Sequence, residues 1–198
     1  KLTFKTFSAN IERNSFEGSF ELKNFSDPQI LLNMKTELYF NDIKNVFKID
    51  TIDVLKGIAE ADIKYKGNYS ELKLFEFKDL FTKDYIVDVK IKNGELKFKN
   101  NPVILKDISG KIALNRTLYA DSVFFKINDN DFLIDGRISK LFEYFNEKDI
   151  FNINAKVYSR KLNLDDLAVL FRSEKQVSQE SFQFPEKLAL QLRLNIEN

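Results

Sequence analysis

The chain has 198 residues, enough for one domain with a sizeable core, and its 31 Lys and Arg residues nearly balance its 30 Asp and Glu residues. This balance argues against a dedicated nucleic-acid or anionic-membrane surface. Cysteine and histidine are both absent, which excludes disulfides and thiolate nucleophiles and removes the commonest general base and metal ligand.

Alternation of apolar and polar residues predicts strands with one buried face through most of the chain. Residues 1–25 are predicted to form a hairpin that turns at Arg13-Asn14. Asp27-Pro28 marks the next turn. Alternation over residues 30–40 then predicts a long strand.

The next segment is predicted to contain a short helical turn over 41–47, capped by Asn41. Strand pattern resumes over 51–67, where Gly57 indicates a bulge. A short strand and a tucked aromatic turn are predicted within 72–81.

The central stretch carries the strongest local signal. Val87, Val89 and Ile91 alternate with charged residues, and Asn93-Gly94 follows them. Asn-Gly is typical of a type I′ hairpin turn, which needs positive φ at both central residues. A two-residue turn here would place Ile91 opposite Leu96 on the apolar face of a hairpin.

Three further strands are predicted over 108–114, 119–127 and 132–138. They are joined by short polar turns, without a long helix between them. Such connections predict an antiparallel sheet.

The last part of the chain mixes short elements. Helical turns are predicted at 140–146 and 165–171, a strand over 151–157 and a mobile loop over 172–184. The regular alternation of 188–196 predicts a final strand. We therefore expect residues 1–198 to be one β-segment cut from a longer, repeat-like protein.

No catalytic or metal site is predicted. The pair Asp165-Asp166 fits a helix N-terminus. The run from Asp129 to Gly136 has some spacing of a calcium loop, but Leu133 occupies a ligand position and the distal Glu is missing. A plain turn is favoured, and we expect neither an enzyme nor a cofactor.

The apolar faces of the strands leave two interpretations open. They could pack against a second sheet as a sandwich core. They could instead form a curved sheet whose open face binds an apolar ligand.

Three stretches carry a resemblance to a known family. They are GELKFKNNPVILKDISGKIALN after Asn93, DFLIDGRISKLFEYF from Asp131 and YSRKLNLDDLAVLF from Tyr158. Between about Ala61 and Phe171 the chain resembles the AsmA-like family of envelope proteins, of the AsmA/TamB type found in Bacteroidetes-type bacteria.

The resemblance implies a mainly β fold, an elongated antiparallel meander curved into an open, taco-like β-groove. It also implies a periplasmic segment of an inner-membrane-anchored protein that binds or conducts phospholipid in outer-membrane biogenesis. Membrane contact would come through segments outside this chain. The alternative is a structural or assembly module that docks another envelope protein without lipid.

The groove interpretation predicts which residues line the apolar face. They are the inward-facing residues of the central meander: Val87, Val89, Ile91, Leu96, Phe98, Ile108, Ile112, Leu114, Phe132, Ile134 and Ile138.

Overall fold

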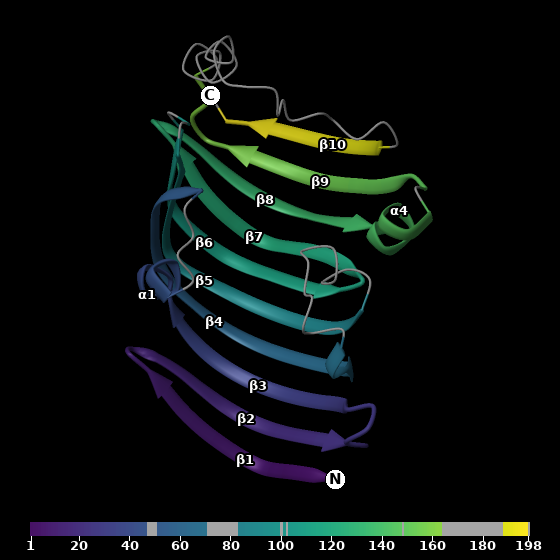
Figure 1. The fold of residues 1–198 in the computed structure, drawn as a ribbon. Helices are drawn as coiled ribbons and strands as arrows, with labels where there is room; N and C mark the ends of the chain where they lie inside the picture. Colours follow the sequence, from purple (N-terminus) through teal and green to yellow (C-terminus); the bar gives the residue numbers. More distant parts are fainter. Residues whose placement is uncertain are drawn as a thin grey trace.

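The computed structural model describes residues 1–46, 51–70, 83–99, 101, 103–147, 149–163 and 188–197. These residues form a single ten-stranded sheet in which each strand pairs with the strands next to it in the sequence. The two end strands do not pair with each other, so the sheet is open and not closed. Figure 1 shows the strands stacked in chain order and bowed across the sheet.

The elements follow one another with two short helices between them. In chain order they are β1 (Leu2–Ile11), β2 (Asn14–Lys23), β3 (Gln29–Tyr39), α1 (Phe40–Val46), β4 (Ile52–Asn68), β5 (Asp84–Phe98), β6 (Ile104–Asn115), β7 (Thr117–Ile127), β8 (Asn130–Ser139), α4 (Leu141–Glu147), β9 (Phe151–Ser159) and β10 (Leu188–Ile196).

The predicted mainly β meander is confirmed, with two corrections. Strands β1 to β9 pair antiparallel, but β10 pairs parallel to β9. Helix α1 begins at Phe40, so Asn41 lies inside the helix and not at its cap. The predictions within 72–81, 165–171 and 172–184 lie outside the described residues.

The predicted hairpin at Asn93-Gly94 is wrong. Strand β5 continues through both residues, and its whole length pairs with the 17-residue strand β4. Ile91 lies opposite Ala59 and Leu96 lies opposite Leu55. The long partner strand offers ladder hydrogen bonds on both sides of Asn93, which a reversal of the chain would forfeit.

Asn93 instead belongs to a line of β-bulges that crosses four neighbouring strands. Gly57 in β4, Asn93 in β5, Asp107 in β6 and Ser122 in β7 all have positive φ, and the pairing register shifts beside each of them. A Cβ on Gly57 would lie 2.8 Å from the Cα of Gly94, so adjacent bulges nest closely. Bulges bend a strand and increase its twist, so a line of them accounts for the bowing visible in Figure 1.

Two apolar clusters lie on the same face of the sheet. Ile30, Tyr65 and Tyr85 form the first, with the two tyrosine rings stacked at 4.6 Å between centroids. Leu114, Leu141 and Phe151 form the second, where α4 contributes Leu141. Val87 packs against both clusters and so connects them.

Candidate functional site

The strand register aligns apolar residues into two rows that cross the whole sheet. We define row 1 as Phe7, Gly18, Met34, Ile63, Val87, Leu114, Leu118, Ile138, Ile153 and Leu190. Row 2 lies beside it and consists of Ala9, Phe16, Thr36, Ala61, Val89, Ile112, Ala120, Gly136, Ala155 and Leu192. Neither row contains a charged residue, so all ten strands present one continuous apolar face.

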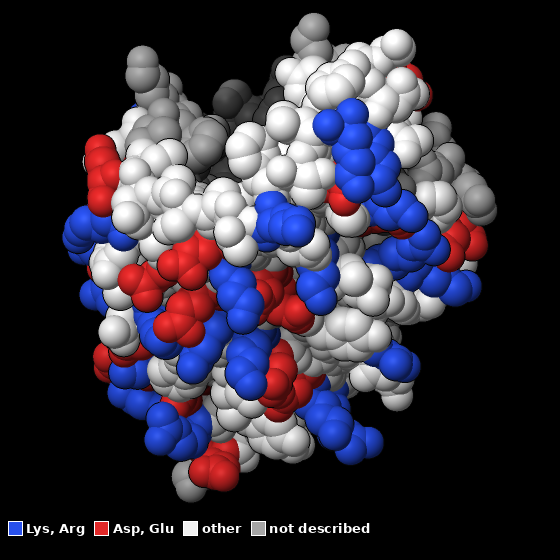
Figure 2. All heavy atoms as spheres, turned by 90° about the horizontal axis from the view of Figure 1, so that it is seen from below, with Lys and Arg blue, Asp and Glu red and all other residues white. Residues whose placement is uncertain are grey.

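The opposite face is charged. Residues that alternate with the two rows include Glu60, which pairs with Lys92, and Lys56, which pairs with Glu95 at 2.9 Å. Figure 2, which views the molecule from below, shows acidic and basic side chains interleaved over the surface. Mixed signs of this kind make a solvated outer face.

A depression of about 660 Å³ lies on the charged face across β2 to β7. Acidic residues such as Asp62 and Asp88 line it together with Lys35, Lys90 and Lys111. Within the described ranges, no group of three or more acidic side chains is arranged to hold a metal ion.

All eleven residues predicted to line the apolar face lie on that face. Leu114 is buried and Phe98 is 47% exposed, whereas the other nine are half-buried. These residues share one face even though the predicted hairpin at Asn93 is wrong. A one-residue bulge shifts the alternation of inward-facing residues in the same way as a two-residue turn would. Ile91 and Leu96 therefore share a face in either arrangement.

The apolar face extends well beyond the predicted set. Phe20, Leu32 and Tyr65 continue it over β2 to β4, and the leucines of β10 continue it at the other end. The same period-2 alternation was visible in those strands. The prediction missed them because it considered only the central meander.

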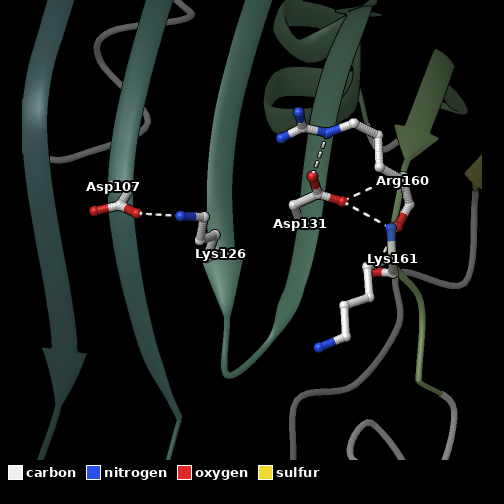
Figure 3. Close-up of polar contacts among 6 residues, drawn as sticks. Asp107, Lys126, Asp131, Arg160 and Lys161 are labelled. Carbon is white, nitrogen blue, oxygen red and sulfur yellow. Dashed lines mark hydrogen bonds and ion pairs between the residues drawn. The ribbon is translucent and has the colours of Figure 1, made fainter.

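Polar contacts fix the chain where β8 begins and β9 ends. The Asp131 carboxylate accepts hydrogen bonds from the Arg160 side chain at 2.8 Å, from the Arg160 backbone N–H at 2.8 Å and from the Lys161 backbone N–H at 3.1 Å. Figure 3 shows these contacts converging on one carboxylate, with the exposed pair Asp107 and Lys126 on the neighbouring strands.

These contacts also lower the pKa of the Asp131 carboxyl group. Burial alone would raise the pKa of the carboxyl group, but the hydrogen bonds from Lys161 and Arg160 outweigh it and hold the pKa below its usual range. Asp131 belongs to the run that has some spacing of a calcium loop. Its carboxylate instead accepts hydrogen bonds from the Arg160 side chain and from two backbone N–H groups.

No family model matches the chain. No curated protein matches it either, and neither does any solved structure. Among the helices that the structure describes, none has the length and apolar character needed to cross a membrane.

Proposed function

We propose that this chain is a non-enzymatic lipid-binding segment whose apolar face holds acyl chains and lets them slide across the strands. One observation carries the proposal: two adjacent rows without a charged residue run unbroken through all ten strands. A sandwich core would need a second layer, and the described residues supply only two helices of 7 residues each.

The dimensions suit such a ligand. Ten strands at a spacing of about 4.8 Å give a face about 43 Å long, whereas an acyl chain reaches about 15 Å. Several apolar side chains remain accessible on this face, including Phe98 at 47%, Leu190 at 58% and Leu192 at 55% exposed. Several exposed apolar side chains that share one face are typical of a binding surface.

Binding of this kind would need no catalytic group. Burial of apolar surface contributes about 25 cal/mol per Å² and has no preferred direction, so a lipid tail could shift from strand to strand with little change in free energy. The resemblance to AsmA-like proteins agrees with this mechanism. It would put the segment in the periplasm of a bacterial envelope, within an inner-membrane-anchored protein that serves outer-membrane biogenesis.

The test is native mass spectrometry of the chain purified from bacteria without detergent, followed by solvent extraction. Bound phospholipid is expected in the wild type and should be lost in Ile112→Asp, which puts a charge into row 2. Lys111→Asp is the matched control, because it puts the same charge one residue away on the opposite, charged face. Circular dichroism must show that both variants keep the β-sheet.

A wild-type chain that carries no lipid and binds none from added vesicles would overturn the proposal. Loss of lipid in Lys111→Asp as well as Ile112→Asp would also count against it, since the effect would then not depend on the apolar face.

A second candidate function rests on the outer edge of β10, which pairs with β9 alone among the described strands. This nine-residue strand contains no proline, and Leu190, Leu192 and Leu194 are each about half exposed. An edge strand of this composition can pair with a further strand. Concentration-dependent oligomers without bound lipid would favour an assembly module that docks another envelope protein.

A further inference from the structure

Thr36 is the single polar side chain in row 2. It lies in β3, with Phe16 and Ala61 opposite it on the neighbouring strands. Thr36 is only 6% exposed, and its hydroxyl oxygen Oγ1 has no hydrogen-bond partner among the residues that the structure describes. A buried hydroxyl without a partner is destabilising, and valine would have nearly the same shape without this defect.

The surroundings of Thr36 can adapt to a ligand. Three of the nearest positions on the same face are occupied by small residues, Gly18, Ala59 and Ala61. Met34, the only methionine of the chain, precedes it on the same face. Methionine is unbranched and flexible, so it can move aside when a ligand enters.

Together with the lipid-binding function on which it depends, this arrangement leads to a more specific assignment. We propose that the Thr36 hydroxyl donates a hydrogen bond to the ester carbonyl oxygen of a bound acyl lipid. The lipid displaces the side chains that enclose Oγ1 in the empty protein. The hydroxyl thereby fixes one position of the lipid on a face that otherwise binds without direction.

Thr36 also lines the depression on the charged face, but the rows on its own face carry no charge, which selects a neutral acceptor. Rows 1 and 2 contain no cation, and the adjacent Lys35 and Glu37 belong to the charged face. A carboxylate at Oγ1 would be buried without a counter-charge, which is far costlier than burial of a hydrogen-bonded carbonyl. An ester carbonyl is also the polar acceptor directly attached to an acyl chain.

The experiment compares a diacyl phosphatidylethanolamine with its dialkyl ether analogue of equal chain length, which lacks the ester carbonyls. Binding of each to the full chain is measured by titration in native mass spectrometry. The wild type should prefer the ester lipid by about three- to tenfold, the effect of one net hydrogen bond. Thr36→Val should lose this preference, and Thr36→Ser should keep it.

Thr117→Val is the matched control, because Thr117 is a half-buried strand threonine at the start of β7. It should leave the ester preference unchanged. Thr36→Val should also unfold at the same or a higher temperature than the wild type when no lipid is present, which separates loss of binding from loss of fold.

The outcomes distinguish the two proposals. If wild type and Thr36→Val bind the ester lipid with the same preference, the role of Thr36 is overturned and lipid binding stands. If the wild type binds neither lipid, the proposed function fails. If Thr36→Val weakens palmitate but not the ester lipid, the acceptor is a free carboxyl group and the ester assignment is wrong.

Discussion

Asn14 and Asn130 occupy the same position in two distant hairpins and make the same pair of contacts. Each begins the second strand of its hairpin, and each donates from Nδ2 to a backbone carbonyl three residues earlier, Ile11 at 3.0 Å and Ile127 at 3.2 Å. Each accepts a hydrogen bond on Oδ1 from a backbone N–H at or just beyond the end of the following strand, from Tyr39 and Asn163. Both asparagines are almost fully buried, at 2% and 0% exposed.

Because the two asparagines make the same contacts, their replacement should lower the free energy of unfolding by similar amounts. Asn14→Ala and Asn130→Ala should each lower the free energy of unfolding by about 1–3 kcal/mol, because a backbone N–H loses its partner in a buried site. Urea denaturation followed by circular dichroism measures the change. Asn33→Ala is the control, since the hydrogen bond from its side chain to the Ser19 hydroxyl, at 3.4 Å, is exposed and weak. Its effect should stay within about 0.5 kcal/mol, and an equal loss in all three variants would refute the prediction.

The line of bulges predicts opposite outcomes for two neighbouring positions. Gly57→Ala should destabilise the protein or prevent folding, because φ is 114° and the new Cβ would lie 2.8 Å from the Gly94 Cα. Asn93→Gly should be nearly neutral, since Asn93 already has φ of 53° and glycine adopts this conformation without strain. Thermal unfolding of both variants is the measurement. A stable, cooperatively folding Gly57→Ala would mean that β4 does not carry the bulge.

Asp131 predicts the direction of acid sensitivity. Because its pKa is depressed in the folded protein, its contribution to stability is present above the pKa of an unfolded Asp, about 3.9, and is lost as the pH falls through the lower folded value. Asp131→Asn should therefore be less stable than the wild type at pH 7, and the difference should shrink below about pH 4.

The measurement is urea unfolding between pH 7 and pH 2.5. Asp129→Asn serves as the control, because the Asp129 side chain is 76% exposed and pairs with exposed Lys161. An exposed pair contributes little, so this variant should follow the wild type. A difference between Asp131→Asn and the wild type that stays constant with pH would contradict the prediction.

The tyrosine pair of β4 and β5 is expected to be the most sensitive point of the first apolar cluster. Tyr65 is 2% exposed, stacks on Tyr85 and donates its hydroxyl to the Asn68 carbonyl at 3.1 Å. Tyr65→Ala should cost about 3–5 kcal/mol through the cavity it leaves. Tyr65→Phe should cost about 1 kcal/mol, since only the hydrogen bond is lost. Comparable losses in the two variants would show that the hydroxyl, and not the ring, dominates.

Alternation was sufficient to predict most strands and the face on which the apolar residues lie. Period-2 patterning depends only on local sequence and on the pleat of a strand, so the inward sets of β3 and β5 followed directly. The sandwich interpretation is not what the described residues form, since they make one sheet.

Pairing was harder to predict, as Asn93 and β10 show. Asn-Gly supplies positive φ equally well to a turn and to a bulge, and only the partner strand decides between them. Here that partner is β4, whose Gly57 bulge nests against Gly94. The parallel pairing of β10 with β9 likewise depends on the path of the chain between them. The alternation of apolar and polar residues does not determine that path. Thr36 was missed because a threonine within an alternating strand looks like any other β-branched residue.

Pairing only between sequence neighbours gives the sheet a one-dimensional character. Its free energy is then approximately a sum over adjacent strand pairs, as in solenoid proteins, and no single contact closes the structure. Opening can begin at β1 or β10 and progress inward one strand at a time, so amide exchange should be slowest in β4 and β5 and faster toward both edges. The molecule would then fray from its edges under conditions in which a closed barrel of the same size would unfold all at once.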